Sequence, residues 1–276
     1  MTRSKLIVLL LLVTTFMGHA QTYEWSSVVM DGSRTGCTPF AINNLEGTLG
    51  VFLEDGTYIA PNGRIYAAGS LTARTAAIVR DAQEPMKRVK TVIIQSDAEM
   101  RAYRYETPLS NWYVNMVMQK VGALAGKKID VGIGNFGGIR LNMPKGDVTL
   151  DDMLSMFPFK NYVVYLEHKG SELRKIFEKM AATRFEAVGG VEIVAENKKL
   201  TKALIGGEPI DDDKLYTVAT ISFLLYGGDN LTLAENAVNM EIYDVTIIDM
   251  VMEYIDNLNK EGKNITPPTE RYVVVK

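Results

Sequence analysis

The chain is 276 residues long, carries 30 basic and 33 acidic residues, and has a formal net charge of −3. A protein of this length forms one large domain or two small ones, and an apolar content of 47% is ordinary for a globular fold. A mildly acidic chain without a basic cluster lacks the cationic track that polymeric nucleic acid requires, so we exclude a partner of that kind.

The first twenty residues have the pattern of a cleaved secretory signal peptide. Arg3 and Lys5 precede an uncharged apolar run over 6–17, and Gly18-His19-Ala20 supplies the small residues that a signal peptidase recognises. The run is too short to span a bilayer of ~30 Å, and no later segment approaches the necessary length. We therefore expect an exported protein, periplasmic or extracellular, without a membrane span. Removal of the leader takes away Arg3 and Lys5, so the mature chain would have 28 basic and 33 acidic residues and a net charge of −5.

Residues 21–74 are rich in turn residues, which predicts an extended, partly irregular lead-in to a domain over 75–276. Short β-prone pieces over 50–53 and 64–67 interrupt this lead-in. Cys37 is the only cysteine, so no disulfide stabilises the chain. We interpret Cys37 as a small buried residue rather than as a reactive or intermolecular thiol.

From residue 72 onward, the apolar spacing alternates between helical and strand periods. Helices are predicted over 72–86, 109–124 and 245–259, with a short helix capped by Thr149 and a longer one opened by Ser171. Strands are predicted over 88–95, 128–133, 161–167, 191–194, 200–205, 215–219 and 272–275. Helices follow strands but hairpin-like pairs also occur, so the pattern predicts an α/β (α+β) domain with mixed sheets flanked by helices.

Few side chains in this chain could hold a catalytic metal. His168 is the one histidine after the leader, and we place it at a solvated surface turn. Metal sites that hydrolyse phosphate esters need a cluster of His, Asp and Asn ligands. Asp211-Asp212-Asp213 lacks the alternating oxygen ligands and the turn glycine of an EF-hand loop, which predicts a charged turn. We therefore expect no metal ligand, no cofactor and no catalytic residue on this chain.

The letters of 132–137 match a dinucleotide-binding fingerprint and follow a predicted strand. That fingerprint requires a helix to begin at its last glycine, facing the pyrophosphate. Asn142, Pro144 and Gly146 follow too soon to allow such a helix, so we reject a Rossmann site. A serine nucleophile elbow and a phosphate-cradling Gly-Lys-Ser/Thr loop are also absent from the sequence.

Three segments at predicted element ends join a permissive backbone to a group that can hold a flat polar ligand. They are residues 135–140, 158–161 and 223–229. In the first, two adjacent glycines allow a ligand close to the backbone, and the Arg140 guanidinium offers a planar fork to oxygen acceptors. Any one of these segments alone is ordinary, and only the ordered set of three predicts a nucleotide pocket.

The aromatic residues of these segments suit a base. Phe159 and Phe223 come from separate loops and could sandwich a base, since stacking contributes ~1–3 kcal/mol per ring and tolerates any base. Asp229, after two glycines, could accept hydrogen bonds from ribose hydroxyls. Asn161 could read a base edge.

Residues from about 109 to 238, roughly half of the chain after the leader, resemble the C-terminal domain of the 5′-nucleotidase family. The combination of five motifs is highly specific. In chain order they are Asn135-Phe136-Gly137-Gly138-Ile139-Arg140, Gly146-Asp147-Val148-Thr149, Pro158-Phe159-Lys160-Asn161, Leu215-Tyr216-Thr217-Val218-Ala219-Thr220 and Phe223-Leu224-Leu225-Tyr226-Gly227-Gly228-Asp229.

The resemblance implies a substrate-binding role for this domain, which in the family binds the nucleoside part of the substrate. It implies that two aromatic rings stack on the base, that the asparagine and arginine near the Gly-Gly turn help to hold the nucleotide, and that the aspartate contacts the ribose. These roles fall on Phe159, Phe223, Asn135, Arg140 and Asp229, with Asn161 as a further candidate. Arg104 is considered as a match for the arginine that the family carries upstream of these motifs.

The chain departs from the family pattern at three places. Phe136 replaces a small residue, Asn230 replaces a common glycine, and the helix start Ser110-Asn111-Trp112-Tyr113 differs from the usual sequence. The family's metallophosphoesterase domain is not recognisable before residue 75. We therefore expect the nucleotide-recognition half of an exported 5′-nucleotidase-type hydrolase, inactive alone, with two divalent metals on a separate metallophosphoesterase chain. The alternatives are a non-catalytic nucleoside- or nucleotide-binding protein and a structural or surface-interaction protein.

Overall fold

The computed structural model describes residue 47 and residues 49–276, so the expectations for the leader and for Cys37 lie outside the described residues. The chain divides into two compact units between Glu84 and Pro85. The sequence placed the start of the larger domain at residue 75, within a helix that belongs to the first unit.

The first unit combines a small antiparallel sheet with one longer helix. Its elements are β1 (Val51–Phe52), β2 (Tyr58–Ile59), β3 (Ile65–Tyr66) and α3 (Leu71–Asp81). Ser70 caps α3, because its side chain accepts a hydrogen bond from the Ala73 N–H at 3.3 Å. The two β-prone pieces predicted in the lead-in are confirmed, and β2 between them completes a three-stranded sheet.

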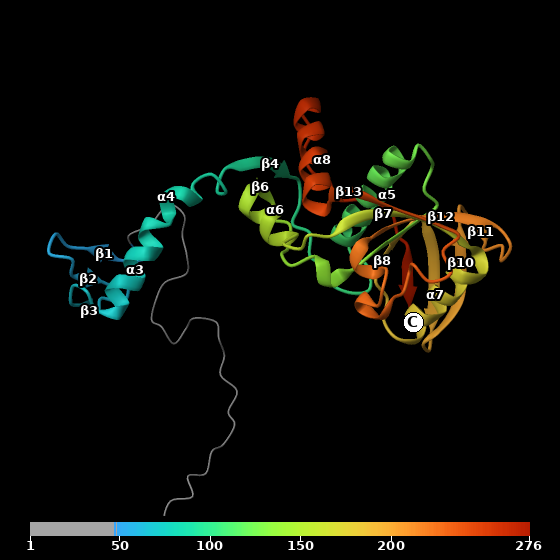
Figure 1. The fold of residues 1–276 in the computed structure, drawn as a ribbon, viewed down its shortest axis with the longest axis horizontal. Helices are drawn as coiled ribbons and strands as arrows, with labels where there is room; N and C mark the ends of the chain where they lie inside the picture. Colours follow the sequence, from blue (N-terminus) through green and yellow to red (C-terminus); the bar gives the residue numbers. More distant parts are fainter. Residues whose placement is uncertain (1–46, 48) are drawn as a thin grey trace, which may run out of the picture. The chain divides into compact units, whose positions relative to one another are not determined.

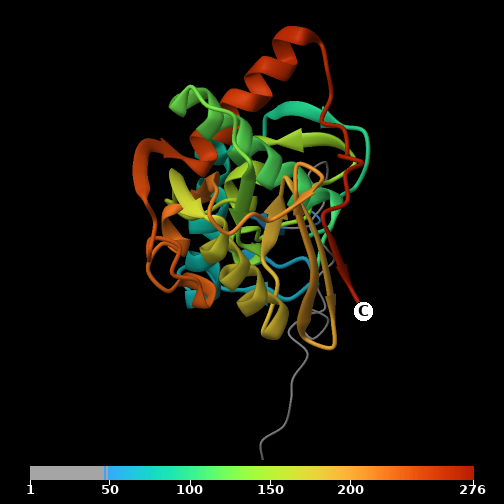
Figure 2. The same ribbon diagram turned by 90° about the vertical axis from the view of Figure 1, so that its right-hand side faces the viewer.

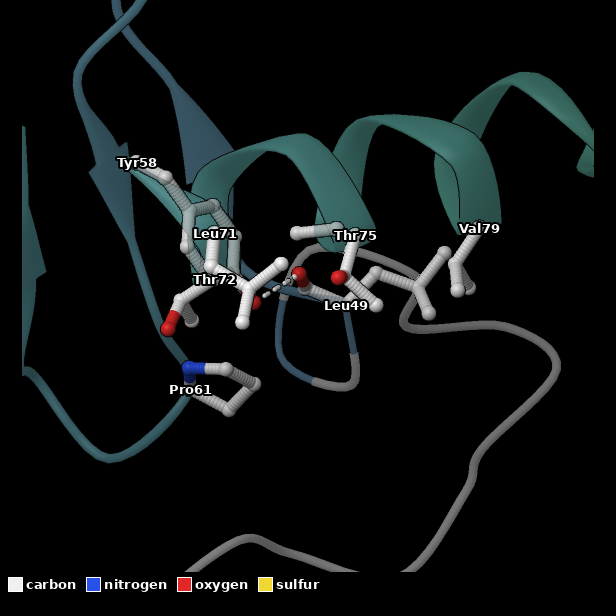
Figure 3. Close-up of a pocket in the computed structure, with 8 residues that line it drawn as sticks. Leu49, Tyr58, Pro61, Leu71, Thr72, Thr75 and Val79 are labelled. Atoms are coloured by element: carbon white, nitrogen blue, oxygen red, sulfur yellow. Dashed lines mark hydrogen bonds between the residues drawn. The ribbon is translucent and has the colours of Figure 1, made fainter. Parts of the chain in front are cut away.

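A cavity of about 440 Å³ lies between α3 and the strands of the first unit (Figure 3). The Tyr58 hydroxyl donates a hydrogen bond of 2.8 Å to the Leu49 carbonyl oxygen at one side of this cavity. The lining residues are apolar or carry a hydroxyl group: Leu49, Tyr58, Pro61, Leu71, Thr72, Thr75, Ala76 and Val79. The cavity therefore presents no charged side chain to a ligand.

Three sheets form the second unit (Figure 1). The largest has the order β13 (Asn239–Thr246), β7 (Tyr162–Lys169), β12 (Leu215–Ile221), β5 (Val131–Gly134), β8 (Ala187–Gly189). A second has the order β11 (Glu208–Pro209), β10 (Lys199–Ile205), β9 (Val191–Glu196), β14 (Val273–Val275), and a third pairs β4 (Val92–Ser96) with β6 (Gly146–Thr149).

The sheets mix parallel and antiparallel pairs, as the sequence predicted. β12 runs parallel to β5 and β14 parallel to β9, whereas the remaining pairs are antiparallel. Figure 2 shows the C-terminal strand β14 beside the hairpin of β9 and β10. The predicted α/β class with mixed sheets flanked by helices is confirmed.

Five helices follow α3 in the described part of the chain: α4 (Gln83–Met86), which spans the division between the units, α5 (Pro108–Ala125), α6 (Leu150–Met156), α7 (Gly170–Ala182) and α8 (Ile247–Glu261). Threonine side chains cap α5, α6 and α8. Thr107, Thr149 and Thr246 each form a capping box with the residue three positions on, which confirms the predicted cap at Thr149. Among the described residues, no helix has both the length and the apolar character to cross a membrane.

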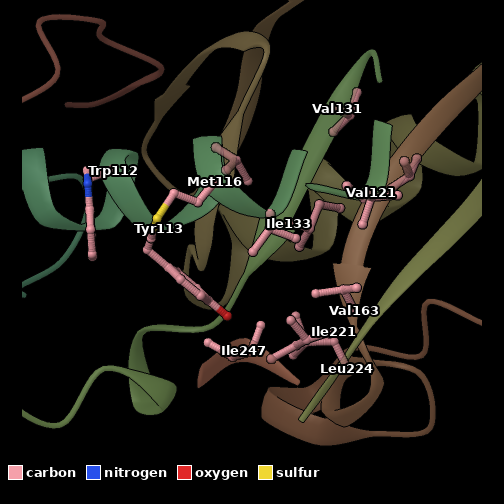
Figure 4. Packing of buried hydrophobic residues seen from close by; sticks show 14 of the residues in the cluster. Trp112, Tyr113, Met116, Val121, Val131, Ile133, Val163, Ile221, Leu224 and Ile247 are labelled. Atoms are coloured by element: carbon pink, nitrogen blue, oxygen red, sulfur yellow. The ribbon is translucent and has the colours of Figure 1, made fainter. Parts of the chain in front are cut away.

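The core of the second unit forms where α5 lies on the large sheet (Figure 4). Glycines in β5 allow this close approach, because a Cβ on Gly132 would lie 2.6 Å from the Met118 side chain and one on Gly134 would lie 2.5 Å from the Tyr113 ring. The first two glycines of the apparent dinucleotide fingerprint, Gly132 and Gly134, therefore serve helix–sheet packing. A three-residue 3-10 turn, η2 (Phe136–Gly138), follows β5, which confirms the rejection of a Rossmann site.

Apart from the two-residue strands β2 and β11, three strands of the structure were not predicted: β6, β8 and β13. β8 has three residues and ends in glycine, so it carries too short a signal. β6 coincides with the motif Gly146-Asp147-Val148-Thr149, for which the sequence predicted only the helix cap at Thr149. β13 is an edge strand whose side chains are mostly exposed, and it contains a register shift between Ile242 and Thr246, so its apolar residues do not mark one buried face.

His168 does not lie at a solvated turn, and that prediction is wrong. It lies inside β7 with no exposed surface, and its Nε2 atom is 2.8 Å from the Leu233 carbonyl oxygen. The strand continues through Lys169, because the side chain at 168 packs into the core rather than ending the strand. The imidazole is a structural group that connects β7 to the segment after β12.

Acidification is expected to destabilise the fold through His168. Burial lowers the pKa of His168 below its ordinary value of 6.5, since desolvation disfavours the charged imidazolium. Below pH 6.5 the unfolded chain therefore binds a proton that the folded chain does not. The free energy of unfolding should fall by up to about 1.4 kcal/mol per pH unit as pH decreases below 6.5.

Urea unfolding between pH 7 and pH 5 tests this expectation. His168→Gln keeps an amide donor for the Leu233 carbonyl oxygen but cannot titrate, so its stability should decrease less over this range. Carboxyl groups other than Glu172, whose charge interacts with His168, titrate equally in both proteins and cancel in the comparison. Equal losses in the two proteins would contradict a contribution from the imidazole.

Candidate functional site

The large sheet brings the three predicted site segments to one edge. Gly134, the last residue of β5, pairs with Ala187 at the start of β8. Ile221, the last residue of β12, pairs with Val163 near the start of β7. The edge at which β5 and β12 end and β7 and β8 begin is called the site edge. The segments that extend from it are 135–140, 158–161 and 223–229.

Asn135 and Asp229 meet at this edge although they lie 94 positions apart in the chain. The Asn135 Nδ2 atom donates a hydrogen bond of 3.0 Å to the Asp229 Oδ2 atom. Asn135 is buried, and its Oδ1 atom has no hydrogen-bond partner among the described residues. A Cβ on Gly138 would lie 2.5 Å from that Oδ1 atom, so the second glycine of the turn is required for Asn135 to fit.

A strained turn presents Asp229. Asp229 has a φ of 48° in the left-handed region, inside the 3-10 turn η4 (Gly228–Asn230). A Cβ on Gly228 would overlap the Phe223 carbonyl oxygen and would lie 2.8 Å from the Phe223 ring. Only glycine at 228 therefore allows Phe223 and Asp229 to occupy their observed positions together.

The two phenylalanines are partly open to solvent rather than packed in the core. Phe159 is 47% exposed and Phe223 is 45% exposed. Within the part of the chain that the structure describes, neither ring contacts another aromatic ring. A hydrogen bond of 3.0 Å from the Tyr162 N–H to the Ser222 Oγ atom connects the segments that carry the two rings. Exposed rings on joined segments are free to stack on a ligand.

Arg140 and Asn161 occupy different positions relative to these groups. The Arg140 guanidinium carbon lies 5.8 Å from the centre of the Phe159 ring, close enough for a cation–π contact. Asn161 acts through its backbone, because its carbonyl oxygen accepts a hydrogen bond of 2.9 Å from the Ile247 N–H at the start of α8. Its side chain forms no hydrogen bond with Asn135, Asp229 or any other described residue.

Sequence reasoning missed Arg184 and Glu186, which precede β8 at the site edge. The Arg184 Nη2 atom lies 2.8 Å from the Asp229 Oδ1 atom. The Glu186 Oε2 atom accepts a hydrogen bond of 2.8 Å from the Phe136 N–H, and its Oε1 atom lies 2.7 Å from the Arg104 Nη1 atom. The one available signal was a charged pair directly before a short apolar stretch, which is too common to identify a site.

Phe136, the departure from the family pattern, does not lie beside the exposed rings. Its side chain is buried, and the Arg104 guanidinium carbon lies 5.1 Å from the centre of its ring. Arg104, considered as the family's upstream arginine, is therefore placed between the Phe136 ring and Glu186. Its Nη1 atom also donates a hydrogen bond of 2.5 Å to the Phe185 carbonyl oxygen.

Across residues 49–276, no group of three or more His, Cys, Asp or Glu side chains is arranged to hold a metal ion. The predicted charged turn at 211–213 is confirmed. Asp211 Oδ1 accepts a hydrogen bond from the Asp213 N–H at 3.0 Å, and Asp212 forms an ion pair with Arg174. The described side chains therefore do not fit the two divalent metals that the resemblance implies.

Comparison with known proteins identifies relatives of the second unit. The family model for the 5′-nucleotidase C-terminal domain matches residues 82–236. Protein UshA of Yersinia enterocolitica is 28% identical over 175 residues, which are 60% of this chain and 31% of that protein. Protein UshA of Salmonella pullorum is 36% identical over 112 residues, 39% of this chain and 20% of that protein.

The fold is similar to that of a solved 5′-nucleotidase precursor from Thermus thermophilus, with a TM-score of 0.64 and 22% identity. The similarity covers 79% of this chain and 48% of that protein. The chain thus spans about a third or less of the curated relatives and about half of the solved structure. The comparisons concern the domain and its fold, and each relative is considerably longer than the region matched.

Proposed function

Because the chain belongs to the family of 5′-nucleotidase C-terminal domains, we propose that it binds nucleoside monophosphates or nucleosides at the site edge. The observation that carries this proposal is the convergence of three distant segments on one sheet edge. There, two half-exposed phenylalanine rings accompany the buried Asn135, which is hydrogen-bonded to the partly exposed Asp229. A flat base and a polar sugar need these two kinds of surface side by side.

The proposed roles follow from what each side chain offers. Phe159 and Phe223 stack on the base, because both rings have free surface and stacking does not depend on the identity of the base. Asp229 and Asn135 contact the ribose, and the exposed Arg140 guanidinium beside Phe159 supplies positive charge for the phosphate. Asn161 is assigned to the base edge, because its side-chain amide has no hydrogen-bond partner among the described residues and can offer both a donor and an acceptor.

We assign the catalytic step to a separate metallophosphoesterase chain that carries two divalent metals. The assembled enzyme would hydrolyse a nucleoside monophosphate to a nucleoside and phosphate. This chain supplies recognition of the base and ribose, and no chemical step is assigned to its own side chains. The basic, apolar and small-residue regions of the leader support export to a periplasm or to the medium, where extracellular nucleotides would be the substrates.

Calorimetry and a hydrolysis assay test this function. The chain alone should bind AMP and adenosine but release no phosphate from AMP. Hydrolysis should appear when a candidate metallophosphoesterase chain and Mg²⁺ or Mn²⁺ are added. Binding without hydrolysis in every mixture would favour a non-catalytic nucleotide-binding protein, and absence of binding would favour a structural protein.

Removal of metal should separate binding from hydrolysis. EDTA is expected to abolish phosphate release by the mixture while the affinity of this chain for adenosine stays within twofold. The reason is that the proposed nucleoside contacts involve no metal ligand on this chain. The control is the same titration with excess Mg²⁺ restored, and a loss of adenosine binding upon chelation would contradict the division of roles.

A further inference from the structure

Glu186 is a buried carboxylate between two guanidinium groups. Its side chain is 1% exposed, and its Oε1 atom lies 2.7 Å from Arg104 Nη1 and 3.3 Å from Arg184 Nε. Its Oε2 atom accepts the Phe136 N–H hydrogen bond. A buried carboxylate is retained only where such partners compensate its desolvation, so the position of Glu186 is strongly determined.

Arg184 transmits this position to the proposed ribose contact. Its Nε atom faces Glu186, while its Nη2 atom lies 2.8 Å from Asp229 Oδ1. The opposite oxygen of Asp229 accepts the hydrogen bond from Asn135. The Asp229 carboxylate is therefore held on both sides, by a guanidinium on one oxygen and by an amide on the other.

Without Glu186, Arg184 would keep Asp229 as its one polar partner among the described residues. The Arg184 side chain is 47% exposed, and its recorded polar partners are Glu186 and Asp229. An arginine side chain loses rotamer entropy when it is ordered, so an exposed arginine with a single ion pair is weakly held. Two carboxylates facing two ends of one guanidinium hold it in one orientation.

We propose that Glu186 and Arg184 are positioning residues that set the selectivity of this site for the ribose diol, an inference that rests on the proposed function. Each Asp229 oxygen has one hydrogen-bond partner and can accept a second. These are acceptors, and they match a ligand that presents two adjacent O–H donors. A nucleoside without the 2′ and 3′ hydroxyl groups cannot use them.

The two positioning residues act on the sugar and not on the base. Their polar partners are Arg104, Phe136 and Asp229, and both residues precede β8 rather than lying in the segments that carry the Phe159 and Phe223 rings. Their removal should therefore change the ratio of affinities for adenosine and 2′,3′-dideoxyadenosine, while base stacking is preserved. If the two residues were purely structural, their removal would weaken the binding of both nucleosides to the same extent.

Calorimetry with adenosine and 2′,3′-dideoxyadenosine on the full chain tests the inference. The wild-type protein should prefer adenosine at least tenfold. Glu186→Gln keeps an oxygen acceptor for the Phe136 N–H but removes the charge that orients Arg184, and the preference should fall below about threefold. Arg184→Gln should reduce the preference for adenosine to the same extent. Because Arg184 is half-exposed, this substitution does not put folding at risk. Affinity for the dideoxynucleoside should stay within twofold in both variants.

The double variant and a matched control complete the experiment. Because Glu186 acts on Asp229 through Arg184, combining the two substitutions should reduce the preference for adenosine little more than either substitution alone. Glu172→Gln removes a carboxylate that pairs with Lys175 at the start of α7, at the opposite end of β7 from the site edge, and should leave the preference unchanged.

The outcomes separate the two hypotheses. Adenosine binding with an unchanged preference in both Glu186→Gln and Arg184→Gln overturns the positioning role and leaves the proposed function intact. A parallel weakening of both ligands also overturns it, because it indicates loss of structure rather than loss of sugar recognition. Failure of the wild-type chain to bind any nucleoside or nucleotide overturns the proposed function and this inference together.

Discussion

Replacing either Phe159 or Phe223 with alanine is expected to weaken adenosine binding at least tenfold. Each ring is about half exposed and has no aromatic partner among the described residues, so its free face is available to a base. A lost stack costs ~1–3 kcal/mol, and about 1.4 kcal/mol corresponds to a factor of ten. Calorimetry on each variant measures the change, and the double variant should lose roughly a hundredfold if the two faces act independently.

Leu215→Ala is the matched control for these variants. Leu215 is 46% exposed and begins β12, the same strand whose opposite end leads to Phe223. This substitution removes a similarly exposed apolar group away from the site edge, and adenosine affinity should stay within twofold. Wild-type affinity in both phenylalanine variants would exclude a base sandwich between these rings.

Gly228→Ala should have the second large effect, because it changes the backbone that presents both Phe223 and Asp229. The new Cβ would overlap the Phe223 carbonyl oxygen, so either the ring or the left-handed turn must move. Overpacking of this kind costs about 1–3 kcal/mol of stability. Adenosine affinity should fall more than tenfold, since stacking and sugar contacts depend on the same turn.

Gly137→Ala provides a comparison within the same site. A Cβ there would lie 3.5 Å from Asn135 Nδ2 and 3.7 Å from Asp229 Oδ2, which are ordinary contact distances. Thermal unfolding should therefore distinguish the two alanine variants, with a lower midpoint for Gly228→Ala and little change for Gly137→Ala. Equal midpoints would show that the turn after Gly227 can relax without disturbing the fold.

The regular elements of the second unit were largely predictable from local pattern. Helices α5 and α8 carry apolar residues at helical spacing, and β7 and β12 are short runs of β-forming residues bounded by turns. The edge strand β13 was missed because exposure on both faces removes the alternation that identifies a strand. His168 was misplaced because a lone histidine beside Lys169 and Gly170 has the same local pattern whether it is solvated or buried.

The candidate site residues also differ in whether the local sequence reveals them. Glycine and proline mark Asn135, Arg140, Phe159 and Asp229 in the sequence, because a close backbone approach demands special residues next to the group it presents. No such mark accompanies Arg184 or Glu186. Asp229 lies 45 positions from Arg184, and the Phe136 N–H lies 50 positions from Glu186, so nothing within their own segment indicates these contacts with the site.

Mixed sheets, the order of the motifs and the family could be recognised from the chain alone, since hydrophobic period and turn residues act over a few neighbouring positions. The ion pairs of Arg184, the burial of His168 and the backbone role of Asn161 depended on the folded molecule. Sheet register decides which strand ends become neighbours, and a charged side chain takes its partner from whichever segment leaves the adjacent strand.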